Sequence, residues 1–121
     1  MEGSERETLL RGIDLFNQGK YYECHDVMEY LWGHGTNELR DLYKGILHLA
    51  VALYHFRNHN LKGTESLLGS GVKLLEHYVP FSEGIDIFLL VSDAKAFLQQ
   101  IPRGEPGACR IFTITLREVA K

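Results

Sequence analysis

Residues 42–56 read LYKGILHLAVALYHF and contain the most apolar run of the chain. Apolar side chains recur there every three or four residues, which is typical of one face of a helix. The residues of this stripe are Leu42, Ile46, Leu49, Leu53 and Phe56. Further apolar residues extend around most of the same cylinder, and a helix of this kind is covered by other helices. We therefore expect residues 38–59 to form the central helix of an all-α fold.

Four further helices are expected around the central one, at about residues 4–18, 21–32, 61–78 and 82–98. Ser4 and Glu7 have the spacing of a capping box at the start of the first helix. Gly19 suits the left-handed turn that ends it. Because the connection to the second helix is short, these two helices should form an antiparallel hairpin.

A weak internal sequence similarity supports an arrangement of hairpins. Phe16-x-x-Gly19 precedes the second helix, and Phe56-x-x-His59 precedes the fourth, at an offset of 40 residues. Two stacked helical hairpins would produce this similarity, although two units are too few to define a repeat array. The prediction is a single domain, residues 1–121, of about five helices.

The C-terminal part of the chain has a different pattern. Residues 102–107, PRGEPG, are expected to form a loop. Beyond them, Phe112, Ile114 and Leu116 alternate with polar residues, as in a strand, but no partner strand is evident in the sequence. We expect an extended C-terminal tail that lies on the compact multihelical bundle or pairs with a second copy of the chain in a homodimer.

Composition narrows the classes of function. The chain has 121 residues, is 45% hydrophobic and 24% charged, and carries a net charge of −3, which is typical of a globular protein. No block of Lys and Arg stands out, so we expect neither nucleic acid nor a membrane surface as a partner. The N-terminal residues lack an apolar signal region, and Cys24 and Cys109 fit a reducing compartment as lone thiols. These features predict a cytoplasmic protein.

The second helix, YYECHDVMEYLW at residues 21–32, carries the pattern that points to a site. At 100° per residue, one side of it presents Tyr21, His25, Met28, Glu29 and Trp32. The middle of this stripe holds an imidazole and a carboxylate where a core-facing helix has aliphatic residues. Burying ionisable groups costs free energy unless they are paired or bind something, so the stripe predicts a functional site.

His25 and Glu29 are four residues apart, the spacing of two metal ligands on a zincin helix. Zinc, manganese, iron or nickel would accept this pair if a second helix completed the set. His55 is the best candidate for that third ligand, because it lies deep in the central helix and shares a face with His48. No other cofactor is expected.

Around such a site, Tyr21, Trp32 and His48 are expected to contact an unidentified small-molecule ligand, and a hydrolytic reaction would be consistent with the metal. The alternative is a non-enzymatic helical interaction module, in which His25 and Glu29 form a buried structural pair. In either case Asp26 is expected to face away from His25 into solvent.

These residues resemble a known family. The motif His25-x-x-x-Glu29-x-x-Trp32, preceded by FNQGKYYE at residues 16–23, is similar to the signature of domain-of-unknown-function family 309, a family of small helical bacterial and archaeal proteins. GILHLAVALYH at residues 45–55 extends the resemblance, which covers about residues 9–98.

The resemblance implies an all-helical fold and a motif suspected of binding metal, without an established activity. It assigns His25, Glu29 and Trp32 to the motif and makes His55 a further polar position. The chain has Cys24, Asp26 and His48 where family members tend to have Ala, Glu and Gln. Because family members tend to have glutamine at the position of His48, the resemblance implies that His48 makes hydrogen bonds in the wall of the site and is not a metal ligand.

Overall fold

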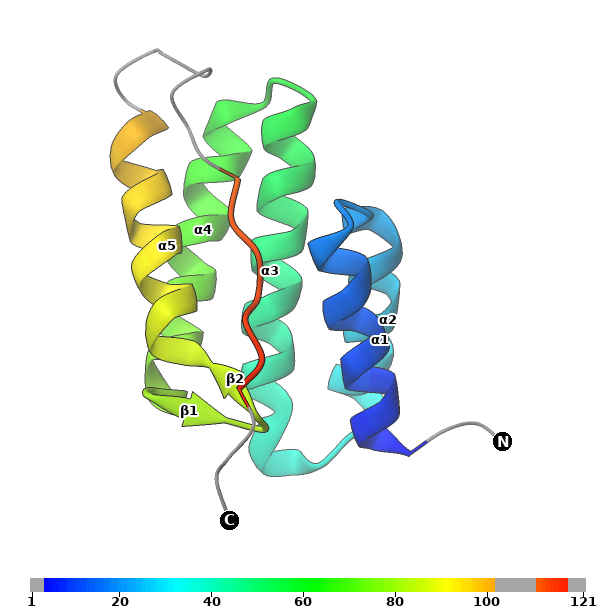
Figure 1. Ribbon diagram of the computed structural model, residues 1–121. Helices are drawn as coiled ribbons and strands as arrows, with labels where there is room; N and C mark the ends of the chain where they lie inside the picture. The colour runs from blue at the N-terminus through cyan, green and yellow to red at the C-terminus, as the bar shows by residue number, and fades with distance from the viewer. Residues whose placement is uncertain (1–3, 102–110, 118–121) are drawn as a thin grey trace.

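The computed structural model describes residues 4–101 and 111–117, and this part of the chain forms a bundle of five α-helices (Figure 1). The helices are α1 (Glu5–Asn17), α2 (Tyr21–His34), α3 (Arg40–Arg57), α4 (Leu61–Leu75) and α5 (Ile87–Gln100). Short 3₁₀ helices, η1 (Asn37–Leu39) and η2 (Glu76–Tyr78), lie before α3 and after α4. The predicted all-α bundle of about five helices is confirmed.

Helix α3 lies at the centre, packed against α2 and α4. Its predicted stripe is buried: Leu42, Ile46, Leu49 and Leu53 have no exposed surface. Each such side chain contributes roughly 1.5–3 kcal/mol when it is removed from water. None of the helices in the described ranges is long and apolar enough to cross a membrane.

The two helix hairpins, α1–α2 and α3–α4, each contain a turn of the same geometry between their helices. Gly19 and His59 both adopt left-handed backbone conformations, with φ of 79° and 65°. In each turn, the left-handed residue donates its N–H to the carbonyl three residues back, and the next residue donates to the carbonyl five residues back. The sequence similarity at an offset of 40 residues therefore reflects two equivalent helical hairpins.

The start of α1 holds the two hairpins together. As predicted, Ser4 and Glu7 form a capping box. Glu5 then accepts hydrogen bonds from the backbone N–H of Thr36, at 2.8 Å, and from the hydroxyl of Tyr43 in α3. The bond from Tyr43 lowers the pKa of Glu5. The beginning of α1 is thus fastened to the α2–α3 connection.

The fifth helix starts later than predicted. The expected start at Ser82 and Glu83 is wrong, because Glu83 and Gly84 have positive φ angles of 52° and 78° and cannot continue a helix. Two short antiparallel strands occupy this region, β1 (Phe81–Ser82) and β2 (Ile85–Asp86). Asp86 then caps α5 by accepting a hydrogen bond from the Leu89 N–H at 2.9 Å.

The C-terminal tail, residues 111–117, runs between α1 and α5 (Figure 1), and the ring of Phe112 lies near those of Phe16 in α1 and Phe97 in α5. Phe112 and Ile114 are buried, and the side-chain amide of Asn17 makes hydrogen bonds of 2.9 and 2.7 Å with the backbone of Ile114. Ile85 in β2 forms a β-bridge with Leu116, so a partner strand does exist. The sequence did not reveal it because β2 has only two residues.

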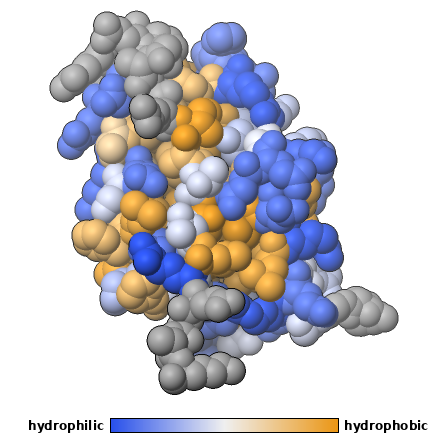
Figure 2. Space-filling model, viewed as in Figure 1, coloured by the Kyte–Doolittle hydropathy of each residue, from blue (hydrophilic) through white to orange (hydrophobic). Residues whose placement is uncertain are grey.

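The face that carries the tail has apolar residues along its middle and hydrophilic residues toward its sides (Figure 2). The buried tail residues belong to the core of their own chain, which agrees with a tail that lies on the bundle, and the homodimer stays a prediction. The predicted loop at residues 102–107 and Cys109 lie outside the described residues.

The equivalent turns predict opposite effects of two substitutions. His59→Gly should stabilise the fold by up to about 1 kcal/mol, because glycine adopts the left-handed conformation without a Cβ clash. Gly19→Ala should destabilise it by about 1 kcal/mol or more. A Cβ at Gly19 would lie 3.8 Å from its nearest neighbour, so the cost comes from the backbone alone. Urea unfolding measures both changes; effects of the same sign would contradict the equivalence.

Candidate functional site

Helix α2 buries a different face from the one predicted. Its buried residues are Tyr21, Cys24, Met28 and Leu31. His25 lies beside this stripe with its side chain 28% exposed, and Glu29 is exposed. The stripe through Cys24 and Leu31 is buried in place of the predicted one, because its burial removes no carboxylate from water. The predicted burial of a His25–Glu29 pair is therefore wrong.

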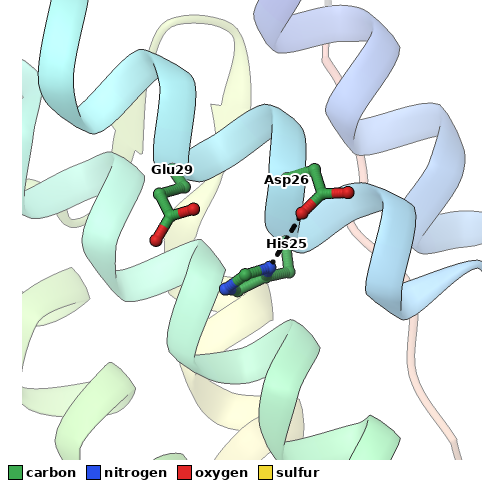
Figure 3. Close-up of side chains that lie close together, drawn as sticks. All are labelled: His25, Asp26 and Glu29. Atoms are coloured by element: carbon green, nitrogen blue, oxygen red, sulfur yellow. Dashed lines mark hydrogen bonds and ion pairs between the residues drawn. The ribbon is translucent and has the colours of Figure 1, made fainter.

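On the outer side of this stripe, His25, Asp26 and Glu29 form a cluster on α2 (Figure 3). Nδ1 of His25 lies 3.3 Å from Oδ1 of Asp26. One donor atom from each of the three residues lies within 4.8 Å of the others. Asp26 is exposed, as expected, but its carboxylate turns toward His25 rather than away from it. Asp26 is thus a candidate ligand that the sequence analysis missed.

The donor set of this cluster suits a divalent transition metal. It offers one imidazole nitrogen and two carboxylate groups, a mixture that zinc, manganese and iron accept. Ligands about 2.1 Å from a tetrahedral ion lie roughly 3.5 Å apart, so the three donors would have to approach one another. Asp26 and Glu29 are exposed, and rotation of their side chains can close this gap.

A pocket of about 290 Å³ lies between α2 and α3, with His25 in its wall. Its lining residues are Tyr21, Tyr22, His25, Val51, Tyr54 and His55. The ring of Tyr22 has its centroid 6.0 Å from the rings of both His25 and Tyr54. The structure thus brings His25 and His55 to one pocket, while Glu29 lies outside its lining. Nδ1 of His55 accepts a 3.3 Å hydrogen bond from the side-chain amide of Asn60.

Two further predicted residues face away from this pocket. Trp32 lies under the guanidinium of Arg40, whose Cζ is 4.6 Å from the ring centroid, and lines a separate pocket of about 340 Å³ at the start of α3. His48 faces α4, where its Nδ1 lies 2.8 Å from the hydroxyl oxygen of Ser70. Burial lowers the pKa of His48, and the positive charge of Lys44 lowers it further.

Tyr21 and Cys24 belong mainly to the core. Tyr21 is 3% exposed, its ring packs edge-on against Phe16, and burial raises its pKa. Burial also raises the pKa of Cys24 to about 12, so the thiol stays protonated and does not act as a nucleophile beside His25. Tyr22 and Tyr54, which the sequence analysis did not select, supply most of the pocket's exposed aromatic surface.

Comparison with known proteins supports the predicted resemblance. The family model "Domain of unknown function (DUF309)" matches residues 9–67, a range that contains His25, Glu29 and His55. The uncharacterised protein YpuF of Bacillus subtilis is 33% identical over 84 residues, which are 67% of this chain and 48% of YpuF. An uncharacterised protein of Aquifex aeolicus is 24% identical over 98 residues, 80% of this chain and 28% of that protein. The chain thus spans about half, or less, of each relative.

The lowered pKa of His48 predicts a pH-dependent stability. In the unfolded chain His48 takes up a proton near its ordinary pKa of 6.5, whereas in the folded chain it does so only at lower pH. The contribution of neutral His48 to the free energy of unfolding is therefore complete above pH 6.5. It is lost as the pH falls through the lowered folded pKa. His48→Gln should therefore reduce the loss of unfolding free energy between about pH 7.5 and about pH 5.

Denaturant unfolding at both pH values measures this effect. His77→Gln is the matched control, because His77 is an exposed histidine in η2. Identical pH dependence in the wild type and the His48→Gln variant would contradict the inference.

Proposed function

We propose that this chain, whose residues 9–67 match the model of domain-of-unknown-function family 309, binds a divalent transition metal at His25, Asp26 and Glu29. The observation that carries this proposal is the approach of one imidazole nitrogen and two carboxylate oxygens to within 4.8 Å on one helix. Two acidic groups beside an imidazole favour a cation, and the nitrogen donor favours zinc, manganese or iron over calcium and magnesium.

The proposed function includes a small molecule held beside the metal. The aromatic pocket shares His25 with the cluster, so a molecule in the pocket would lie next to a bound ion. Tyr22 and Tyr54 offer ring faces, and His55 offers a polar contact whose orientation is fixed by Asn60. Such a combination of apolar walls and a few directed polar groups is typical of small-molecule sites.

The chemistry of the bound metal would be that of a Lewis acid, which is consistent with a hydrolytic reaction. Three protein ligands leave coordination positions available to water or to a ligand. In this arrangement His25 contributes to both the metal site and the pocket wall, and His55 orients a ligand from the opposite helix. The site lies at the surface, with Asp26 and Glu29 on its solvent side.

The alternative, a structural His25–Glu29 pair, makes a different prediction about stability. Glu29 is exposed, and substitutions of exposed residues usually change stability by less than about 0.5 kcal/mol. Glu29→Gln should therefore leave the melting temperature of the metal-free protein nearly unchanged. A strongly lowered melting temperature would favour the structural role.

Calorimetric titration of tag-free protein with Zn²⁺ and Mn²⁺ tests metal binding. The wild type should bind one ion. His25→Ala and Glu29→Gln should each weaken binding by roughly 100-fold or more, since loss of a residue that only hydrogen-bonds to a ligand typically costs about 10- to 100-fold. Asp26→Asn should also weaken it. Glu23→Gln, which removes another exposed carboxylate of α2, is the matched control and should bind as the wild type does.

Two results would contradict metal binding on α2, and a third would contradict the choice of ligands. One is the absence of saturable binding of either metal. The other is equal loss of affinity in Glu23→Gln and Glu29→Gln, which would indicate general attraction by acidic residues. If His55→Ala weakens binding as much as His25→Ala, the metal lies between α2 and α3 instead, as the sequence alone predicted.

A further inference from the structure

A second polar pocket lies where α3 meets α4, on residues that the proposed metal site does not use. It has a volume of about 560 Å³. Its polar side chains are Lys44 and His48 from α3 and Ser66, Ser70 and Lys73 from α4. None of these residues lines the aromatic pocket or belongs to the cluster around His25. The pocket therefore needs an explanation of its own.

The charge of this pocket is positive. Its lining contains two lysines and no acidic residue, although the chain as a whole has a net charge of −3. Within the described residues, neither Lys44 nor Lys73 has a carboxylate oxygen within 4.0 Å, whereas Lys95 pairs with Glu76 at 2.9 Å. Two lysines among the lining residues, with no acidic residue beside them, favour an anionic ligand.

His48 and Ser66 add hydrogen-bond donors to the pocket, and Ser70 orients the His48 ring. His48 is half-buried, and its Nδ1 lies 2.8 Å from the Ser70 hydroxyl oxygen. When Ser70 donates its proton to Nδ1, the ring proton sits on Nε2, which becomes a donor. The lowered pKa of His48 favours this neutral form at pH 7. Ser66 supplies a further hydroxyl from the next turn of α4 toward its N-terminus.

We propose that this pocket binds the phosphate group of a small phosphorylated molecule. Two ammonium groups, the Ser66 hydroxyl and an imidazole N–H match the several oxygens and the double charge of a phosphate monoester better than they match a carboxylate. The volume of about 560 Å³ falls within the range of pockets for small organic molecules and exceeds what a free phosphate ion fills. The rest of the molecule would occupy the remaining space.

The position of Gly69 provides a way to block the pocket without disturbing the fold. Gly69 lies in the lining, and a Cβ built on it meets no atom within 4 Å. Gly69→Glu therefore adds a carboxylate to the pocket and no steric clash at the helix. Replacing glycine within a helix also favours the helical conformation.

Binding can be followed through Trp32, the single tryptophan of the chain. The ammonium nitrogen of Lys44 lies 5.9 Å from its ring centroid, so an anion that moves Lys44 should change the tryptophan fluorescence. The full chain is titrated with glucose 6-phosphate, inorganic phosphate and glucose, with a chelator present to keep the site at His25 free of metal. Calorimetry measures the same three titrations independently.

Glucose 6-phosphate should bind saturably and more tightly than inorganic phosphate, and glucose should not bind. Lys44→Gln and Lys73→Gln should each weaken binding by roughly tenfold or more, since each removes a charged hydrogen-bond donor. Gly69→Glu should abolish binding, with the melting temperature preserved. Lys62→Gln, which removes an exposed lysine of α4 outside the pocket, should have no effect.

Three outcomes would overturn the inference. They are the absence of saturable binding, equal affinity for inorganic phosphate and glucose 6-phosphate, and equal weakening by Lys62→Gln and Lys73→Gln. The second would assign the pocket to the free ion, and the third would indicate general attraction to surface lysines. Because the titrations exclude metal, their failure would leave metal binding at His25 unaffected.

Discussion

The burial of α3 between α2 and α4 is the constraint on which the rest of the structure depends. Helices α2 and α4 each belong to a hairpin, and the apolar surface of α3 joins these hairpins into one core. Leu42, Ile46, Leu49 and Leu53 occupy the contact without exposed surface. The aromatic pocket lies at the contact of α3 with α2, and the pocket with Lys44 and Lys73 lies at its contact with α4.

This arrangement gives the protein two chemically different surfaces. Toward α2, the edge of α3 carries Val51, Tyr54 and His55, which close an aromatic pocket next to the acidic cluster at His25. Toward α4, and nearer the N-terminal end of α3, Lys44 and His48 line a basic pocket with Lys73. We propose the first surface for a cation with a small molecule beside it, and the second for an anion. Both use α3 as a rigid support.

The sequence predicted this architecture where the signal was local. The stripe at residues 42–56 and the left-handed turn at Gly19 depend on neighbouring residues only, and both are present. The buried face of α2 was predicted wrongly because Tyr21 and Met28 belong to two overlapping stripes. In the folded chain, tertiary packing buries the stripe that contains Cys24 and Leu31. The pairing of the tail with β2 joins distant residues through a very short strand, and no local pattern reports it.

Anomalous diffraction from crystals grown with saturating Mn²⁺ tests the central claim, a metal site on the solvent side of α2, most directly. The account predicts one anomalous peak bounded by the imidazole of His25 and the carboxylates of Asp26 and Glu29. The absence of a peak there would contradict it. So would a peak held instead by His55 on α3 without Glu29.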